Sequence, residues 1–330
     1  RDLYLVLAVL SFSLLLTVKE TAALTVGSLV AGAFAAWLAA GRGHPLRERV
    51  SWRLWGLLAL AFAVPHILLY TSFFTNPAGL VDSFRSYLPW TEKGFEGTGH
   101  EKPWTYFLKL LVTFEPVALI CGMLGSFLAL LRRNPFGTFC AIWWLTQLAA
   151  YSAIPYKTPW LALNIVLPVT LSSGFFVAEA WKSPLPSALR AALAGAGLLI
   201  LTWTASQAVN VSFLRYDDER LGLVYVQSTR ELRDLMKLID ETAGRSGQGK
   251  ALAIRFYTGN RWPLPWYLRD YTNVLYLNEV PKQPEGDLLL CDPAQEQKLR
   301  ASLPGKYLRR EYTLRERVKL VVYVREQARE

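Results

Sequence analysis

The long apolar stretches in the first two thirds of the chain are the feature that most restricts its fold. Each stretch is continuous, whereas the strands of an outer-membrane barrel are about 10 residues long and alternate polar with apolar residues. An α-helix needs about 20 mainly apolar residues to cross a bilayer. The pattern therefore predicts an α-helical multispanning membrane domain over residues 1–209, with about seven helices. We expect these at residues 3–17, 21–40, 54–74, 104–131, 136–154, 160–181 and 191–209.

The beginning of the chain bears on its completeness. The first apolar stretch, 3–17, is shorter than a perpendicular span, and neither an initiator Met nor a signal peptide precedes it. We therefore expect the chain to be the later part of a longer protein, with sequence missing ahead of Arg1.

The charge balance bears on the partners. Lys and Arg number 36 against 26 Asp and Glu, a formal net charge of +10. Such an excess suits nucleic acid or a membrane protein facing anionic lipid. Because the cations flank apolar stretches, we expect membrane lipids as partners and no nucleic acid. Cys121, Cys140 and Cys291 are widely spaced, so the sequence supports neither a disulfide framework nor a metal site. No cofactor is indicated, and nothing in the sequence supports a divalent metal.

The distribution of cations among the loops predicts the orientation. One set of alternate loops is rich in Arg and Lys, and the opposite loops mix Lys with Asp and Glu. By the positive-inside rule, the first set lies in the cytoplasm. Lys157 and the segment after residue 210 are then expected on the outer side of the cell membrane. The cytoplasmic set consists of Arg42, Arg47, Arg49, Arg53, Arg132, Arg133, Lys182 and Arg190.

Residues 210–330 are predicted to form a small extracytoplasmic α/β domain. The stretch "STRELRDLMKLIDETA" combines a capping box, Ser228 to Glu231, with an apolar helix face. The stretches "ALAIRFY", "NVLYL", "DLLLC" and "VKLVVYV" are typical of strands, and "PAQEQKLRASL" of a helix. A segment of this length is large enough for its own core.

Two polar stretches interrupt the apolar helices. Lys19 and Glu20 in "TVKET" either snorkel from a tight helix–helix turn or line a cavity. Glu115 precedes Pro116 inside the fourth apolar stretch, where a carboxylate is costly unless it is paired or meets water. We favour a cavity wall for Glu115 over a structural polar pair, with a bend of the helix at Pro116.

The loop before the fourth stretch holds His100, Glu101 and Lys102. A single loop histidine is most often solvated. A histidine two residues from a lysine, at the outer end of the membrane spans, also suits phosphate binding, which we favour. Trp90 and Trp104 are explained equally well as interfacial belt residues.

The stretch "YSAIPYKTPW" places a lysine between two prolines. Pro155 and Pro159 bracket Tyr156 and Lys157, and Trp160 starts the next helix. Snorkelling alone requires a lysine, but not two prolines and two aromatic residues. We predict that Lys157 points along the membrane surface as a preorganised cation for the phosphate of a lipid-linked substrate.

The stretch "YTGNRWPLPWYLRDY", residues 257–271, is rich in aromatic residues. Aromatic rings such as Trp262 and Trp266 stack on sugars and isoprenoid chains, and Arg261 or Arg269 suits a pyrophosphate. A loop that docks the tail on the membrane domain is the alternative.

These stretches resemble a known family. "TVKET", "GHEKPWTYFLKLLVTFEP", "YSAIPYKTPWLALN" and "NRWPLPWYLRDY" are similar to stretches of the prokaryotic flippase-activity-associated membrane proteins. That family is a branch of the GT-C glycosyltransferase superfamily, akin to the dolichyl-phosphate-mannose–protein mannosyltransferases. The resemblance runs from Lys19 to about Tyr271. It implies a GT-C-like fold, catalysis on the outer face, a polyprenyl-phosphate sugar donor and a glycan, lipid or protein acceptor.

The resemblance also implies a mechanism. A carboxylate, expected ahead of Arg1, deprotonates the acceptor, which attacks the anomeric carbon with inversion while polyprenyl phosphate leaves. Lys157, Lys102 and Arg261 stabilise that phosphate, and His100 contacts it or the acceptor. The candidate substrate-binding residues are Lys19, Glu20, His100, Lys102, Glu115, Tyr156, Lys157, Trp160, Arg261, Trp262, Trp266 and Arg269.

Two other functions remain open. A translocase or flippase accessory protein would move a polyprenyl-linked sugar without forming a bond, with Glu115 along its path. A membrane anchor would merely present the α/β domain to a partner.

Overall fold

A computed structural model of the chain describes residues 1–41, 44, 49–89, 92, 101–218, 220–315 and 317–326. The chain divides into two compact units, Arg1–Ala208 and Val209–Glu330.

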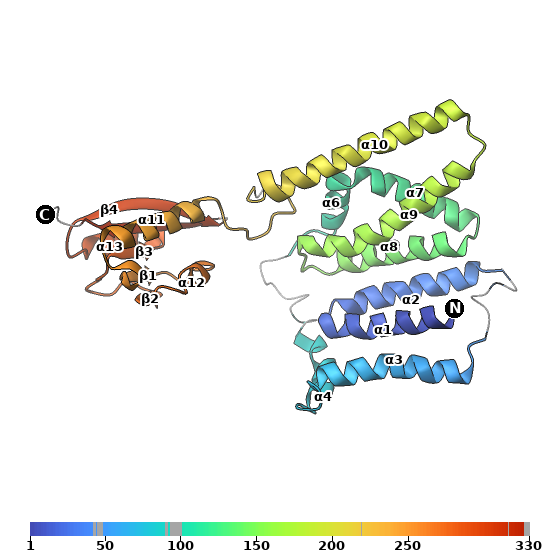
Figure 1. The fold of residues 1–330 in the computed structure, drawn as a ribbon, viewed down its shortest axis with the longest axis horizontal. Coiled ribbons are helices and arrows are strands. Elements are labelled where there is room, and N and C mark those ends of the chain that lie inside the picture. The colour runs from blue at the N-terminus through green and yellow to red at the C-terminus, as the bar shows by residue number, and fades with distance from the viewer. Residues whose placement is uncertain are drawn as a thin grey trace. The chain divides into compact units, whose positions relative to one another are not determined.

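The first unit is a set of long helices in which successive members run in opposite directions (Figure 1). Alternate connections therefore lie at opposite ends of the unit. The short 3₁₀ turn η2 (Pro159–Ala162) leads into α9. The helices are α1 (Asp2–Val18), α2 (Ala22–Ala39), α3 (Trp52–Tyr70), α4 (Gly79–Arg85), α6 (Tyr106–Phe114), α7 (Pro116–Leu131), α8 (Pro135–Ala153), α9 (Leu163–Lys182) and α10 (Ser187–Val209).

Four helices of the described chain are long and apolar enough to cross a membrane, which indicates a membrane protein. These candidate spans are Ala22–Ala39, Trp52–Tyr70, Pro159–Lys182 and Ser187–Leu214, the last of which continues α10 through the π-helical turn η3 (Asn210–Leu214). The sequence predicted about seven spans. Helix α1 has only 17 residues, and α8 carries polar side chains such as Gln147 that lower its hydropathy.

The predicted single helix over residues 104–131 is instead two helices. Helices α6 and α7 meet at an angle of 108° at Glu115, whose backbone (φ −130°, ψ 43°) is not helical. Proline disfavours helical backbone in the residue before it, so Pro116 begins a new helix rather than bending the old one.

Small residues bring α7 and α9 close together. A Cβ atom at Gly125 would lie 2.1 Å from the carbonyl oxygen of Ser172, so only glycine fits there. The Ser173 hydroxyl donates to the Ala118 carbonyl at 2.6 Å, and this bond links the same two helices. Close backbone approach with hydroxyl bridges is typical of helix packing in membranes.

The second unit contains a five-stranded sheet in the order β2-β1-β3-β5-β4 (Figure 1). Strand β1 pairs in parallel with β2 and β3, and β5 pairs antiparallel with β3 and β4. The predicted α/β class and four predicted strands are confirmed, and β4 is an additional polar edge strand. The strands are β1 (Ile254–Tyr257), β2 (Val274–Leu277), β3 (Leu288–Cys291), β4 (Tyr307–Arg315) and β5 (Val318–Arg325). The helices are α11 (Glu231–Arg245), α12 (Leu264–Tyr267) and α13 (Glu296–Ala301), with short 3₁₀ turns η4 (Gly249–Ala251) and η5 (Pro293–Gln295).

Both faces of this sheet are covered by apolar side chains. One core cluster joins α11 and α12 to the sheet through residues such as Leu235, Phe256 and Leu264. The other, on the opposite face, includes Leu289 and Leu299. Every residue of both clusters belongs to the second unit, so this segment has what it needs to fold by itself.

The predicted capping box at the start of α11 is wrong. The carboxylate of Glu231 accepts a hydrogen bond from the backbone N–H of Thr313, and Ser228 forms a β-bridge with Arg315. The residue that precedes α11 is Arg230, which provides no side-chain cap. Ser228 and Glu231, the two residues of the predicted capping box, therefore interact with strand β4 instead of with each other.

Candidate functional site

The candidate site begins where two connections of the helical unit meet. The Lys102 N–H donates to the Pro155 carbonyl at 3.1 Å, and Glu101 forms an antiparallel bridge with Tyr156. The segment before α6 is thereby joined to the connection between α8 and α9. The proline lacks an N–H, so only its carbonyl is used in this pairing.

Lys157 lies inside this junction. Its Nζ donates to the carbonyl of Lys102 at 3.3 Å and to the carbonyl of Ile154, three residues earlier. The side chain is only 1% exposed. The prediction that Lys157 points along the membrane surface is therefore wrong. The side chain folds back because the junction offers two carbonyl oxygens on its inner side.

The electrostatics of Lys157 are unusual. An ammonium group has three N–H donors, and two of them here meet neutral carbonyls. Within the described residues, no carboxylate forms an ion pair with it, and burial lowers the pKa of Lys157. A buried cation without an anionic partner is costly. An anion that reached this ammonium would supply the negative charge that its described neighbours do not provide.

The neighbours of Lys157 differ in exposure. The side chain of Lys102 is exposed, and Tyr156 is half-buried. Trp160 lies in the 3₁₀ turn before α9 and is exposed. The junction therefore combines one buried cation, one exposed cation and two aromatic residues.

Lys19 and Glu20 form the turn between α1 and α2. Their carbonyls accept from the N–H groups of Ala22 and Ala23, at 3.0 and 3.1 Å. Lys19 is exposed, whereas Glu20 is half-buried and interacts with Tyr87. Burial and the Glu20 carboxylate together raise the pKa of Tyr87.

A polar cluster inside the bundle was missed by the sequence analysis. We define it as Thr25, Gln147, Tyr151 and Asn164, from α2, α8 and α9. The Gln147 amide donates to the Thr25 hydroxyl at 3.1 Å, and the Asn164 amide donates to the Tyr151 hydroxyl at 3.0 Å. The Gln147 carbonyl oxygen is buried without a hydrogen-bond partner in the described part of the chain. A glutamine inside a long apolar stretch was the signal that could have revealed it.

Glu115 lines a pocket of about 350 Å³ beside the junction of α6 and α7. Helices α9 and α10 form its other walls, and its remaining polar side chains are Thr170, Ser173 and Thr204. Glu115 is therefore the only carboxylate among the described residues that line this mainly apolar pocket.

An aromatic cluster around His66 was also missed. The His66 ring of α3 lies 5.5 Å from the Phe62 ring and 4.6 Å from the Tyr70 ring. Its Nε2 is 3.4 Å from the Ser83 hydroxyl, and its Nδ1 is buried without a partner among the described residues. His100, which the sequence analysis favoured, lies outside the described residues.

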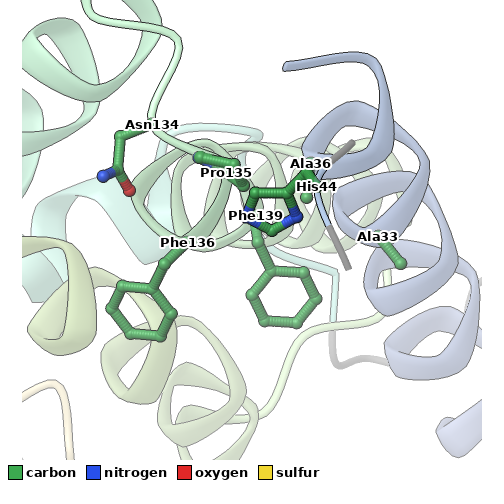
Figure 2. A pocket seen from close by; sticks show the side chains of 7 residues that line it. All are labelled: Ala33, Ala36, His44, Asn134, Pro135, Phe136 and Phe139. Carbon is green, nitrogen blue, oxygen red and sulfur yellow. The ribbon is translucent and has the colours of Figure 1, made fainter. Parts of the chain in front are cut away.

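Two further pockets lie at the opposite end of the helical unit from Lys157. The larger, about 520 Å³, is lined by side chains of α2 and α8 together with His44 and Asn134 (Figure 2). The other, about 460 Å³, includes Glu179 and Lys182, which form an ion pair at 2.7 Å. Neither pocket is lined by a candidate residue from the sequence analysis.

Four candidate residues lie in the second unit, around α12. Trp262 and Trp266 are 61% and 65% exposed. The Arg269 guanidinium lies 4.7 Å from the centre of the Trp266 ring, and that of Arg261 lies 5.4 Å from the Tyr276 ring. All other candidates that the structure describes lie in the first unit.

No group of three or more His, Cys, Asp or Glu side chains that could hold a metal ion occurs within the described ranges. Comparison of the chain with protein-family models, with curated proteins and with solved structures finds no match.

Proposed function

We propose that this protein is a membrane glycosyltransferase that uses a polyprenyl-phosphate-linked sugar as donor. The buried Lys157 ammonium, held by two neutral carbonyls, is the observation that carries the proposal. A phosphate oxygen would give this ammonium a charged acceptor, which it lacks among the described residues, and charge-assisted hydrogen bonds of this kind are strong. The resemblance to GT-C enzymes supplies the reaction class.

In the proposed reaction, the bond between the anomeric carbon and the donor phosphate breaks as the acceptor oxygen bonds to that carbon. A carboxylate takes the acceptor proton, and polyprenyl phosphate leaves with the electron pair. Lys157 stabilises the charge that develops on the leaving phosphate, and Lys102 is the exposed cation beside it.

The reaction is proposed to occur on the outer face of the cell membrane. The cations concentrated in the alternate loops at the opposite end of the helices support this orientation. The α/β unit is then extracytoplasmic.

Binding of polyprenyl phosphate to the purified chain in lipid nanodiscs tests the role of Lys157 directly. A hydrogen bond to a charged group is worth about 1.5–3 kcal/mol, so Lys157→Met is expected to weaken binding by about tenfold or more. Lys182→Met is the matched control, because it removes a lysine from the opposite end of the unit. Radiolabelled sugar transfer is measured on the same samples. Equal binding by wild type and Lys157→Met contradicts the proposal.

A translocase for polyprenyl-linked sugars is the second candidate, and the Glu115 pocket favours it. Interrupted helices recur at the binding sites of transporters, and carboxylates at membrane depth commonly mark substrate and ion pathways. For a translocase, Glu115→Gln would slow the movement of a fluorescent polyprenyl-linked sugar across liposomes. For a transferase, a labelled product would form without such movement.

A further inference from the structure

The second unit displays aromatic side chains on its surface around α12. We define the aromatic face as Trp262, Trp266 and Tyr267 with Arg261 and Arg269. The three rings are 61%, 65% and 46% exposed. Large apolar side chains gathered at one place on a surface commonly mark an interaction site.

Folding of the α/β unit does not account for this face. Helix α12 is held on the core by Leu264 and Leu268, which are buried in the first core cluster. Trp262 and Trp266 come from the same short segment but are exposed and belong to neither of the two core clusters of this unit. The aromatic side chains are therefore available to a partner.

The chemistry of the face matches the headgroup region of a bilayer. Tryptophan and tyrosine are enriched at that depth because their rings are apolar and their edges are polar. The Arg269 side chain lies against the Trp266 ring and also donates to the Trp266 carbonyl at 2.9 Å. The Arg269 guanidinium beside the Trp266 ring is suited to a lipid phosphate, and Arg261, which lies on the Tyr276 ring of β2, is the second cation of the face. Asp270, which directly follows Arg269 in the chain, is an acidic residue next to the two arginines of the face.

The chain itself keeps the α/β unit near a membrane. The candidate span Ser187–Leu214 runs into the start of this unit at Val209, and residues 215–230 lead to α11. A connection of that length extends to at most about 55 Å. Arg230 shortens it further, because it donates to the carbonyl of Leu214 and pairs with Asp217 at 3.4 Å. A bilayer is thus always within reach of the unit.

We propose that the aromatic face binds the headgroup region of the bilayer, with its three rings at the interface and its two arginines on lipid phosphates. This binding is independent of the glycosyl transfer proposed above.

The segment 215–330 provides a direct test, since it contains every residue of both core clusters and its only tryptophans are Trp262 and Trp266. Their fluorescence therefore reports on the face alone. With vesicles of phosphatidylcholine and phosphatidylglycerol, we expect a blue shift of the emission and sedimentation of the segment with the vesicles. The double variant Trp262→Ala, Trp266→Ala is expected to lower vesicle binding by at least about tenfold.

Matched variants separate the contributions. Leu308→Ala removes an exposed apolar side chain from β4, the opposite edge of the sheet, and is expected to leave vesicle binding unchanged. The pair Arg261→Gln, Arg269→Gln is expected to abolish the preference for phosphatidylglycerol over phosphatidylcholine. Circular dichroism verifies that each variant is folded. A wild-type segment that does not bind vesicles overturns the proposal.

The full chain supplies the second measurement. Oxidative footprinting in nanodiscs is expected to show slower oxidation of Trp262 and Trp266 than in the free segment. Protection in the full chain without vesicle binding by the segment means that the face contacts the helical unit instead, and overturns the proposal. Vesicle binding without protection in the full chain also overturns it.

Discussion

Two stretches of this chain have similar composition and opposite structures. "YSAIPYKTPW" (151–160) and "RWPLPWYLRDY" (261–271) both combine prolines, aromatic rings and cations. In the first, Lys157 is buried and bound to backbone carbonyls. In the second, the arginines lie against rings, and Trp262 and Trp266 are exposed. Composition alone therefore does not say which cation a fold buries.

The surroundings of each stretch explain the difference. The first connects two helices and pairs with residues 101–102. This pairing places the carbonyl of Lys102 at the Lys157 ammonium, which also donates to the carbonyl of Ile154. The second is fixed by the buried Leu264, Leu268 and Tyr271, and it leaves Trp262, Trp266 and Tyr267 exposed. A compact ammonium can donate to two backbone carbonyls in a buried position, whereas a planar guanidinium stacks on an aromatic ring. The first stretch suits one bound anion, and the second suits an extended surface.

The largest effect is expected from removing the side chain that anchors the second stretch. Leu264 is fully buried, so Leu264→Ala is expected to destabilise the segment 215–330 by about 2–5 kcal/mol. Denaturant unfolding measures this difference. Tyr267→Ala, an exposed neighbour in the same helix, is the control. If both variants lose the same stability, α12 is not anchored as described.

The next effect concerns the pH dependence of the first stretch. Burial lowers the pKa of Lys157 below its ordinary value of 10.5, so the unfolded chain holds this proton more tightly than the folded chain. The contribution of Lys157 to stability therefore rises as pH increases through the folded pKa, up to about 10.5. Lys157→Met is expected to remove this rise. Thermal unfolding of both proteins in nanodiscs from pH 7 upward measures the difference, and a difference that does not grow with pH contradicts the burial.

The sequence predicted the elements whose signal is local. Continuous apolar stretches located α2, α3, α9 and α10, and β-branched or apolar runs located four strands. Strand β4 was missed because Arg309, Arg310 and Glu311 hide its pattern, which is normal at an exposed edge. The break at Glu115 was predicted only as a bend.

The contacts of the site depended on information that is not local. The burial of Lys157 requires the carbonyl of Lys102, which is 55 residues away in the chain. The pairing of Gln147 with Thr25 spans 122 residues. No periodicity or spacing reveals such partners, so the sequence indicated residue types that suit a phosphate but not which of them the fold encloses.

A smaller effect is expected where the second stretch ends. The Tyr271 hydroxyl donates to the Asp240 carboxylate at 2.6 Å, and Lys250 lies on the Tyr271 ring and binds the same carboxylate. Because Asp240 is more than half exposed, Tyr271→Phe is expected to cost only about 0.5–1 kcal/mol at pH 7. The hydrogen bond from Tyr271 lowers the pKa of Asp240. Its contribution is therefore present above the unfolded pKa and is lost as pH falls through the folded pKa. Denaturation at pH 7 and pH 3 is expected to show a smaller difference between variant and wild type at pH 3.

The smallest effect on stability is expected from Trp266→Ala, in the same helix as Leu264. The Trp266 side chain is 65% exposed, and the cation that lies on its ring, Arg269, is also exposed. Surface substitutions of this kind change stability by about 0.5 kcal/mol or less. Urea unfolding of the segment 215–330 measures this. A tryptophan that contributes nothing to folding but is needed for vesicle binding belongs to a partner surface. A loss comparable to that of Leu264→Ala would instead place Trp266 in the core and remove the contrast between the two stretches.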